Sequence, residues 1–156
     1  MNRYPQRKRT RLPAANYADT SEICSVTIAV RNRQPVFADP SIASDAIGVL
    51  RSLTAARGVR IFAFCVMPDH VHLVMSPSEN CSIITFVGQF KNLVLRSSWK
   101  HRVVGSFWQQ GFWDHFLRAD DDLRPAVEYV LANPVRAGLV DEGHLYPYSG
   151  TLELDL

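Results

Sequence analysis

Two β-rich runs separated by a proline–aspartate turn constrain the fold of this chain more than any other feature. Residues 60–66 (RIFAFCV) and 73–75 (LVM) consist of β-branched, aromatic and aliphatic side chains, which favour strands. Between them, Pro68 and Asp69 are residues typical of tight turns. The pattern therefore predicts two strands, at residues 59–67 and 70–75, that turn back on each other.

Two histidines begin the second of these strands. Side chains two residues apart on a strand point to the same face, so His70 and His72 present their imidazoles side by side. Two neutral imidazoles at this spacing suit a divalent metal ion. The alternative is a pair of half-buried histidines with satisfied hydrogen bonds, and the motif alone does not separate these interpretations.

A predicted helix nearer the C-terminus carries the other candidate groups. Three aspartates at residues 120–122 suit a helix N-terminus, and residues 123–132 continue the helical pattern. Asn133-Pro134 is expected to end the helix, because the residue before a proline is pushed out of the helical region. Tyr129 and Asn133 would share one helix face, as a phenol nucleophile one turn from a polar metal ligand. An ordinary tyrosine beside an asparagine cap is the alternative.

The remaining pattern indicates one small α+β domain. Hydrophobic periodicity predicts four further elements, which are strands at residues 23–31 and 114–118 and helices at residues 40–57 and 82–102. The helix at residues 40–57 is expected to end at Gly58. The resulting order, β-α-β-β-α-β, is the ferredoxin-like one, in which helices cover one face of an antiparallel sheet.

The net charge of +2 conceals an uneven distribution of charge. The first eleven residues hold five basic side chains and no acid, which leaves 12 basic and 15 acidic residues, a net of −3, in the rest of the chain. We therefore expect a basic flexible arm at residues 1–20, a domain at residues 21–150 and a tail at residues 151–156. The arm is suited either to following phosphates or to improving solubility. Its candidate DNA contacts are Arg7, Lys8, Arg9 and Arg11.

A second basic zone lies on the helix predicted at residues 82–102. Apolar residues recur there at helical spacing, and Lys91, Arg96 and Lys100 flank the stripe without an intervening acid. Such a helix is able to lie along a nucleic-acid backbone. An ordinary solvated flank explains the same charges equally well.

Composition narrows the class of protein. A chain of 156 residues that is 47% hydrophobic is long enough for one proper core. No apolar run reaches transmembrane length, and the N-terminus is too charged for a secretory signal. Cys24, Cys65 and Cys81 are odd in number and lack zinc spacing, which predicts reduced thiols in a cytoplasmic protein.

Three separate blocks carry a resemblance to a known family. They are residues 66–74 (VMPDHVHLV), residues 107–115 (FWQQGFWDH) and residues 129–140 (YVLANPVRAGLV). Together, and in this order, they resemble the HUH single-tyrosine transposases, specifically the insertion-sequence-200-like group and its REP-associated branch. That family has a fold of the ferredoxin-like type.

The resemblance implies a reaction and a set of roles. Tyr129 would attack a phosphodiester of single-stranded hairpin DNA and form a covalent 5′-phosphotyrosine, leaving a 3′-hydroxyl. His70, His72 and Asn133 would hold Mg²⁺ or Mn²⁺. The resemblance also implies a bacterial, nucleoid-associated protein with no organic cofactor, and favours a monomer over a homodimer. Arg118 joins the candidate DNA contacts.

Other functions and other contacts stay open at this point. A small-molecule hydrolase built on the histidine pair would need further His, Asp or Lys ligands on other strands, and no such constellation stands in the sequence. A domesticated single-stranded nucleic-acid-binding protein without transposition is compatible with every motif. Aromatic residues that could stack on bases are Trp99, Trp108, Phe112 and Trp113.

Overall fold

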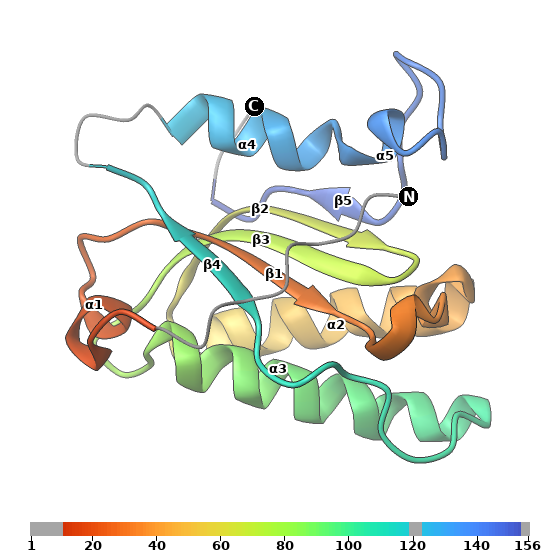
Figure 1. The fold of residues 1–156 in the computed structure, drawn as a ribbon, viewed down its shortest axis with the longest axis horizontal. Coiled ribbons are helices and arrows are strands. Elements are labelled where there is room, and N and C mark those ends of the chain that lie inside the picture. Colours follow the sequence, from red (N-terminus) through yellow and green to blue (C-terminus); the bar gives the residue numbers. More distant parts are fainter. Residues whose placement is uncertain (1–10, 119–122, 154–156) are drawn as a thin grey trace.

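The computed structural model describes residues 11–118 and 123–153, and the predicted hairpin lies at its centre (Figure 1). Strands β2 (Arg60–Met67) and β3 (His70–Ser76) pair antiparallel, with Met67 opposite His70. Three more strands extend the sheet in the order β4-β1-β3-β2-β5, and every pairing is antiparallel. Their bounds are Cys24–Ala29 for β1, Trp113–Phe116 for β4 and Ser149–Gly150 for β5.

Two long helices cover one face of this sheet, below it in Figure 1. Helix α2 (Pro40–Arg57) begins where the Asp39 carboxylate accepts from the backbone N–H of Ser41, and ends at Gly58. Gly58 has φ +72°, a left-handed conformation that glycine adopts without strain. Helix α3 (Ile83–Ser98) is capped by Ser82, whose hydroxyl accepts from the N–H of Thr85. The chain order β1-α2-β2-β3-α3-β4 confirms the predicted α+β, ferredoxin-like fold.

The main core fills the space between the sheet and these two helices. Alternate residues of β3 enter it, and Val71, Leu73 and Met75 are fully buried there. From α3, Phe86 and Phe90 pack into the same cluster. The apolar stripe predicted on the helix at residues 82–102 therefore packs into this core. A short 3₁₀ turn at Trp99–His101 follows α3.

A third helix packs against the opposite face of the sheet, above it in Figure 1. Helix α4 (Leu123–Leu131) buries Val127 and Val130 against a smaller cluster that includes Phe62 and Val74. The predicted aspartate cap at residues 120–122 lies outside the described residues. Asn133-Pro134 does follow the end of α4, but a short helix, α5 (Asn133–Arg136), begins there instead of an extended segment. Pro134 lies in the first turn of α5, where no N–H is needed.

A short helix, α1 (Ala14–Ala18), lies within the range predicted for the N-terminal arm. Its Tyr17 is completely buried, and the Tyr17 hydroxyl donates to Asp114 on β4 at 2.6 Å, whereas most of the other residues from 11 to 20 are exposed. The first ten residues lie outside the described part of the chain. Further 3₁₀ turns occupy Arg31–Arg33 and Val36–Ala38. Within the described ranges, no helix combines the length and apolar content needed to cross a bilayer.

Candidate active site

The sheet register builds a continuous row of side chains beneath the edge of α4. His72 on β3 lies opposite Thr27 on β1 and Cys65 on β2, and Trp113 on β4 lies opposite Thr27. Directly paired residues of antiparallel strands share one face. The row therefore runs across four strands on the α4 side of the sheet, away from the main core.

The histidines lie on this face together. The ring centroids of His70 and His72 are 4.7 Å apart with an interplanar angle of 82°. His70 is buried, with 6% of its surface exposed, and His72 is partly buried. The geometry agrees with the prediction that the two side chains share one face of β3.

Each histidine ring is held through its Nδ1 atom. Nδ1–H of His70 donates to the Asp69 carboxylate at 2.6 Å, because an ionised carboxylate only accepts. This hydrogen bond lowers the pKa of Asp69. Nδ1 of His72 lies 3.1 Å from the Thr27 hydroxyl. Both rings therefore keep Nε2 for a further partner, the arrangement common among metal-binding histidines.

His72 is neutral at physiological pH. Burial, followed by electrostatic interactions with His70 and Arg136, lowers its pKa to about 3. A neutral imidazole retains the lone pair that a metal ion needs. The two rings thus offer nitrogen donors without a competing proton on His72.

Asn133 brings an amide to the same place from α5. Its Nδ2 atom lies 3.2 Å from Nε2 of His70. Two ligands at right angles around one ion, each about 2.1 Å away, are themselves about 3 Å apart. The observed separation fits a shared ion, provided that the amide turns its oxygen inward. Among the described residues, no three His, Cys, Asp or Glu side chains form a metal cluster, so an ion here would rely on the amide and on exogenous oxygens.

Tyr129 stands apart from the other described tyrosines in its exposure. Its side chain is 61% exposed on α4, one turn before Asn133. Tyr17 donates to Asp114, and Tyr146 donates to the carbonyl of Val66 at 2.7 Å. Burial raises the pKa of Tyr146 to about 12. Of the tyrosines in the described ranges, Tyr129 is therefore the one whose side chain is exposed to solvent.

Three of the predicted DNA contacts use their charge within the protein. Lys91 donates to the carbonyls of Gln109 and Gly111 at 2.9 and 3.1 Å, and thereby ties a loop to α3. The guanidinium of Arg11 lies 3.3 Å from Asp114 and 3.9 Å from the centre of the Phe112 ring. Lys100 forms an ion pair with Asp45 at 3.2 Å.

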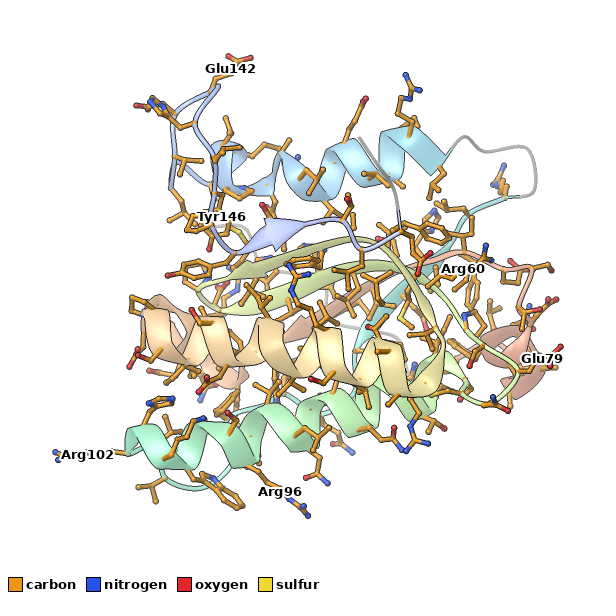
Figure 2. The ribbon with its side chains drawn as sticks, turned by 180° about the vertical axis from the view of Figure 1, so that it is seen from behind. Arg60, Glu79, Arg96, Arg102, Glu142 and Tyr146 are labelled. Carbon is orange, nitrogen blue, oxygen red and sulfur yellow. The ribbon has the colours of Figure 1, made fainter. Side chains whose placement is uncertain are left out.

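The other predicted contacts are divided between the two sides of the molecule. Arg96 is exposed on α3, and Figure 2 shows it projecting on the side of the molecule opposite α4. Arg118 is exposed just beyond β4. Arg7, Lys8 and Arg9 lie outside the described residues.

The structure also separates the predicted stacking residues. Trp108 and Phe112 are 5% and 4% exposed and belong to the main core, so they are not surfaces for bases in this conformation. The Trp108 indole N–H donates to the carbonyl of Lys91. Trp113 is half-buried at the end of the row that contains His72, and Trp99 is exposed near the end of α3.

Sequence reasoning missed three residues that complete the site. Asp69 was assigned only to the turn, although it directly precedes His70 and a carboxylate next to a candidate ligand is a usable signal. Thr27 gave no signal, because its position opposite His72 depends on strand register. Arg136 lies seven residues after Tyr129, a helical spacing, and its guanidinium carbon is 3.8 Å from the Tyr129 ring centre.

Two bacterial proteins are similar in sequence to part of this chain. A protein from Haemophilus influenzae with the provisional name REP-associated tyrosine transposase is 34% identical over 99 residues, covering 56% of this chain and 56% of that protein. The REP-associated tyrosine transposase of Escherichia coli K12 is 29% identical over 94 residues, covering 60% and 54%. The chain thus spans little more than half the length of these relatives.

The fold and the family agree with this similarity. A solved structure of a REP-associated tyrosine transposase bound to a REP hairpin covers 92% of this chain and 82% of its own, with a TM-score of 0.71 and 23% identity. At that identity the likeness shows the fold alone. The family described as "Transposase IS200 like" matches residues 22–130, a range that includes His70, His72 and Tyr129. As its sequence blocks predicted, the chain belongs to the IS200-like transposase family.

Proposed function

We propose that this protein nicks and rejoins single-stranded hairpin DNA through a covalent bond to Tyr129. The observation that carries the proposal is the placement of an exposed Tyr129 one turn from Asn133, whose amide lies 3.2 Å from Nε2 of His70. This placement supports an active site in which a phenol, an amide and two imidazoles act together. The names of the relatives support the same reaction class.

The chain supplies both a nucleophile and a set of metal ligands for this reaction. His70, His72 and Asn133 would hold Mg²⁺ or Mn²⁺, with Asp69 and Thr27 fixing the two rings. When bound, the ion supplies Lewis-acid polarisation of the scissile phosphate.

The covalent step uses the phenol of Tyr129. Its oxygen bonds to phosphorus as its proton leaves to water, and the bond between phosphorus and the 3′-oxygen breaks. The 3′-oxygen takes up a proton and leaves as a free hydroxyl. The phosphotyrosine conserves the bond, so the reverse attack by a 3′-hydroxyl rejoins the strand.

The substrate follows from the family and from the exposed charges. The similar solved structure holds a REP hairpin, which makes a hairpin with a single-stranded foot the first DNA to test. Arg118 and Arg96, together with Arg7, Lys8 and Arg9 of the arm, remain our candidate phosphate contacts. We also propose that the protein acts as a monomer in the bacterial cytoplasm.

The test is capture of the covalent intermediate. A library of labelled hairpin oligonucleotides with a randomised single-stranded foot is incubated with the full chain and Mn²⁺ or Mg²⁺. Mass spectrometry of the digested adduct should identify a phosphotyrosyl peptide that contains Tyr129. Tyr129→Phe should bind the DNA without forming an adduct, whereas the control Tyr148→Phe, in a half-buried tyrosine of the core, should still react. An adduct on any other tyrosine, or none with the unaltered chain, overturns the proposal.

A further inference from the structure

Arg136 is an exposed cation that lies against the ring of Tyr129. Its guanidinium carbon lies 3.8 Å from the centre of the Tyr129 ring, a distance at which the flat cation stacks on the aromatic face. The backbone explains the pairing, since Ala132 N–H donates to the Glu128 carbonyl and Arg136 N–H donates to the Ala132 carbonyl. These bonds keep α5 close to the line of α4, so residues 129 and 136 fall on one side of the helix pair.

The short helix that carries Arg136 also contacts the histidine pair. Asn133 begins α5, and its Nδ2 atom lies 3.2 Å from Nε2 of His70. Arg136 ends the same helix and stacks on the ring of Tyr129. Helix α5 thus joins the tyrosine to the histidine pair, and Arg136 supplies its positive charge.

No protein anion neutralises this charge in the described part of the chain. Arg11, Arg33 and Lys100 each have a carboxylate within 4.0 Å, whereas Arg136 has no ion pair there. An arginine can stack through its flat face and at the same time donate from its edge to a phosphate. The geometry leaves the edge of Arg136 available for an anion.

We propose that Arg136 binds the scissile phosphodiester of the DNA and holds the Tyr129 ring in line with it. The inference rests on the proposed function, because it takes Tyr129 as the nucleophile. Arg136 donates hydrogen bonds to a non-bridging phosphate oxygen and keeps its own proton throughout. Its charge offsets the negative charge that builds on the phosphoryl oxygens as the bond from Tyr129 forms and the bond to the 3′-oxygen breaks.

The kinetic test compares three arginine variants on a hairpin selected from the randomised library. Arg136→Gln should slow adduct formation at saturating DNA by about 10- to 100-fold, and Arg136→Lys should recover part of the rate because it restores charge without the planar stack. Arg51→Gln is the matched control, since Arg51 is also exposed and lies over an aromatic ring, that of Phe64, at 6.0 Å on another part of the fold. An Arg136→Gln rate within twofold of the unaltered chain overturns the inference.

A binding test separates phosphate contact from a merely structural stack. One non-bridging oxygen of the scissile phosphate is replaced by methyl, which removes its charge, and affinity is measured by fluorescence anisotropy. Arg136→Gln should weaken binding of the natural DNA and leave binding of the methylphosphonate DNA unchanged. Equal losses on both DNAs overturn the inference.

The two proposals fail in distinguishable ways. If Tyr129→Phe still forms the adduct, the proposed nucleophile is wrong, whatever Arg136 does. If Tyr129→Phe is inactive while Arg136→Gln behaves as the unaltered chain in both tests, only the role of Arg136 is wrong.

Discussion

The two faces of the sheet differ in composition along the same strand. On β3, Val71, Leu73 and Met75 face α2 and α3 and are fully buried in the main core. The alternate residues His70 and His72 face the other way, toward α4 and α5, and make hydrogen bonds to polar groups. Because side chains alternate along a strand, the residues that form the core and the residues of the candidate site lie on opposite faces of one sheet. We expect substitutions of neighbouring residues on β3 to affect different properties.

The largest effect is expected on the polar face. His72→Ala should reduce nicking of the hairpin DNA by at least about a hundredfold, because it removes a proposed metal ligand. It should change the free energy of unfolding by only about 1 kcal/mol, the worth of one hydrogen bond and partial burial. Gel assays and urea titration measure the two quantities. A variant that unfolds outright would show that the histidine face is structural and break the comparison.

The adjacent residue should give the opposite pattern. Leu73→Ala should lower the free energy of unfolding by about 2–5 kcal/mol, because it opens a cavity in a closely packed core. The fraction that stays folded should nick DNA at close to the normal rate. Urea titration combined with activity per folded molecule tests this. A folded Leu73→Ala protein with no activity would mean that the two faces are coupled.

Two basic residues on α3 allow a similar comparison between a role in stability and a role in DNA binding. Lys91→Met should cost about 1–3 kcal/mol of stability, since two carbonyls lose a charged donor. Arg96→Met should leave stability within about 0.5 kcal/mol, because Arg96 is exposed. If Arg96 does contact a phosphate, its loss should lower the slope of log affinity against log salt by about one unit. An unchanged slope would remove Arg96 from the DNA contacts.

The sequence predicted what depends on local chemistry. The hairpin, the helix ending at Gly58 and the shared face of His70 and His72 follow from turn residues, a left-handed cap and strand periodicity. Residues that meet only in three dimensions were beyond such reasoning. Lys91 was expected at the surface of a DNA-binding helix, yet a loop 18 residues later captures its ammonium group.

The two faces also differ in how far the sequence specified them. Thr27 joins the site through strand register, and register is not written in the sequence of any one strand. Trp108 was a candidate for base stacking, but burial of its large apolar ring in the core stabilises the fold. Packing between elements therefore decided which aromatic and basic residues stay free.

The smallest expected effect concerns pH and the outer side of the two core helices. Asp45 on α2 accepts from His101 at 2.6 Å and pairs with Lys100, so it ties α2 to the 3₁₀ turn that follows α3. These partners, His101 first, hold the pKa of Asp45 below its usual value. A carboxyl with a lowered folded pKa contributes stability that is present above its unfolded pKa of about 3.9. That contribution is lost as the pH falls through the folded value.

Urea unfolding midpoints at several pH values measure this contribution. Asp45→Asn should be less stable than the unaltered chain near neutral pH, and the two should converge under acid conditions, whereas Glu142→Gln, on an exposed loop, should show no such convergence (Figure 2). The difference should be modest, because Asp45 is partly exposed and solvent screens its ion pairs. At each pH, Asp45→Asn and the unaltered chain should nick DNA at the same rate per folded molecule. Asp45 ties helices on the far side of the sheet from the histidine pair. A change in nicking rate that follows the ionisation of Asp45 would contradict the separation of the two faces.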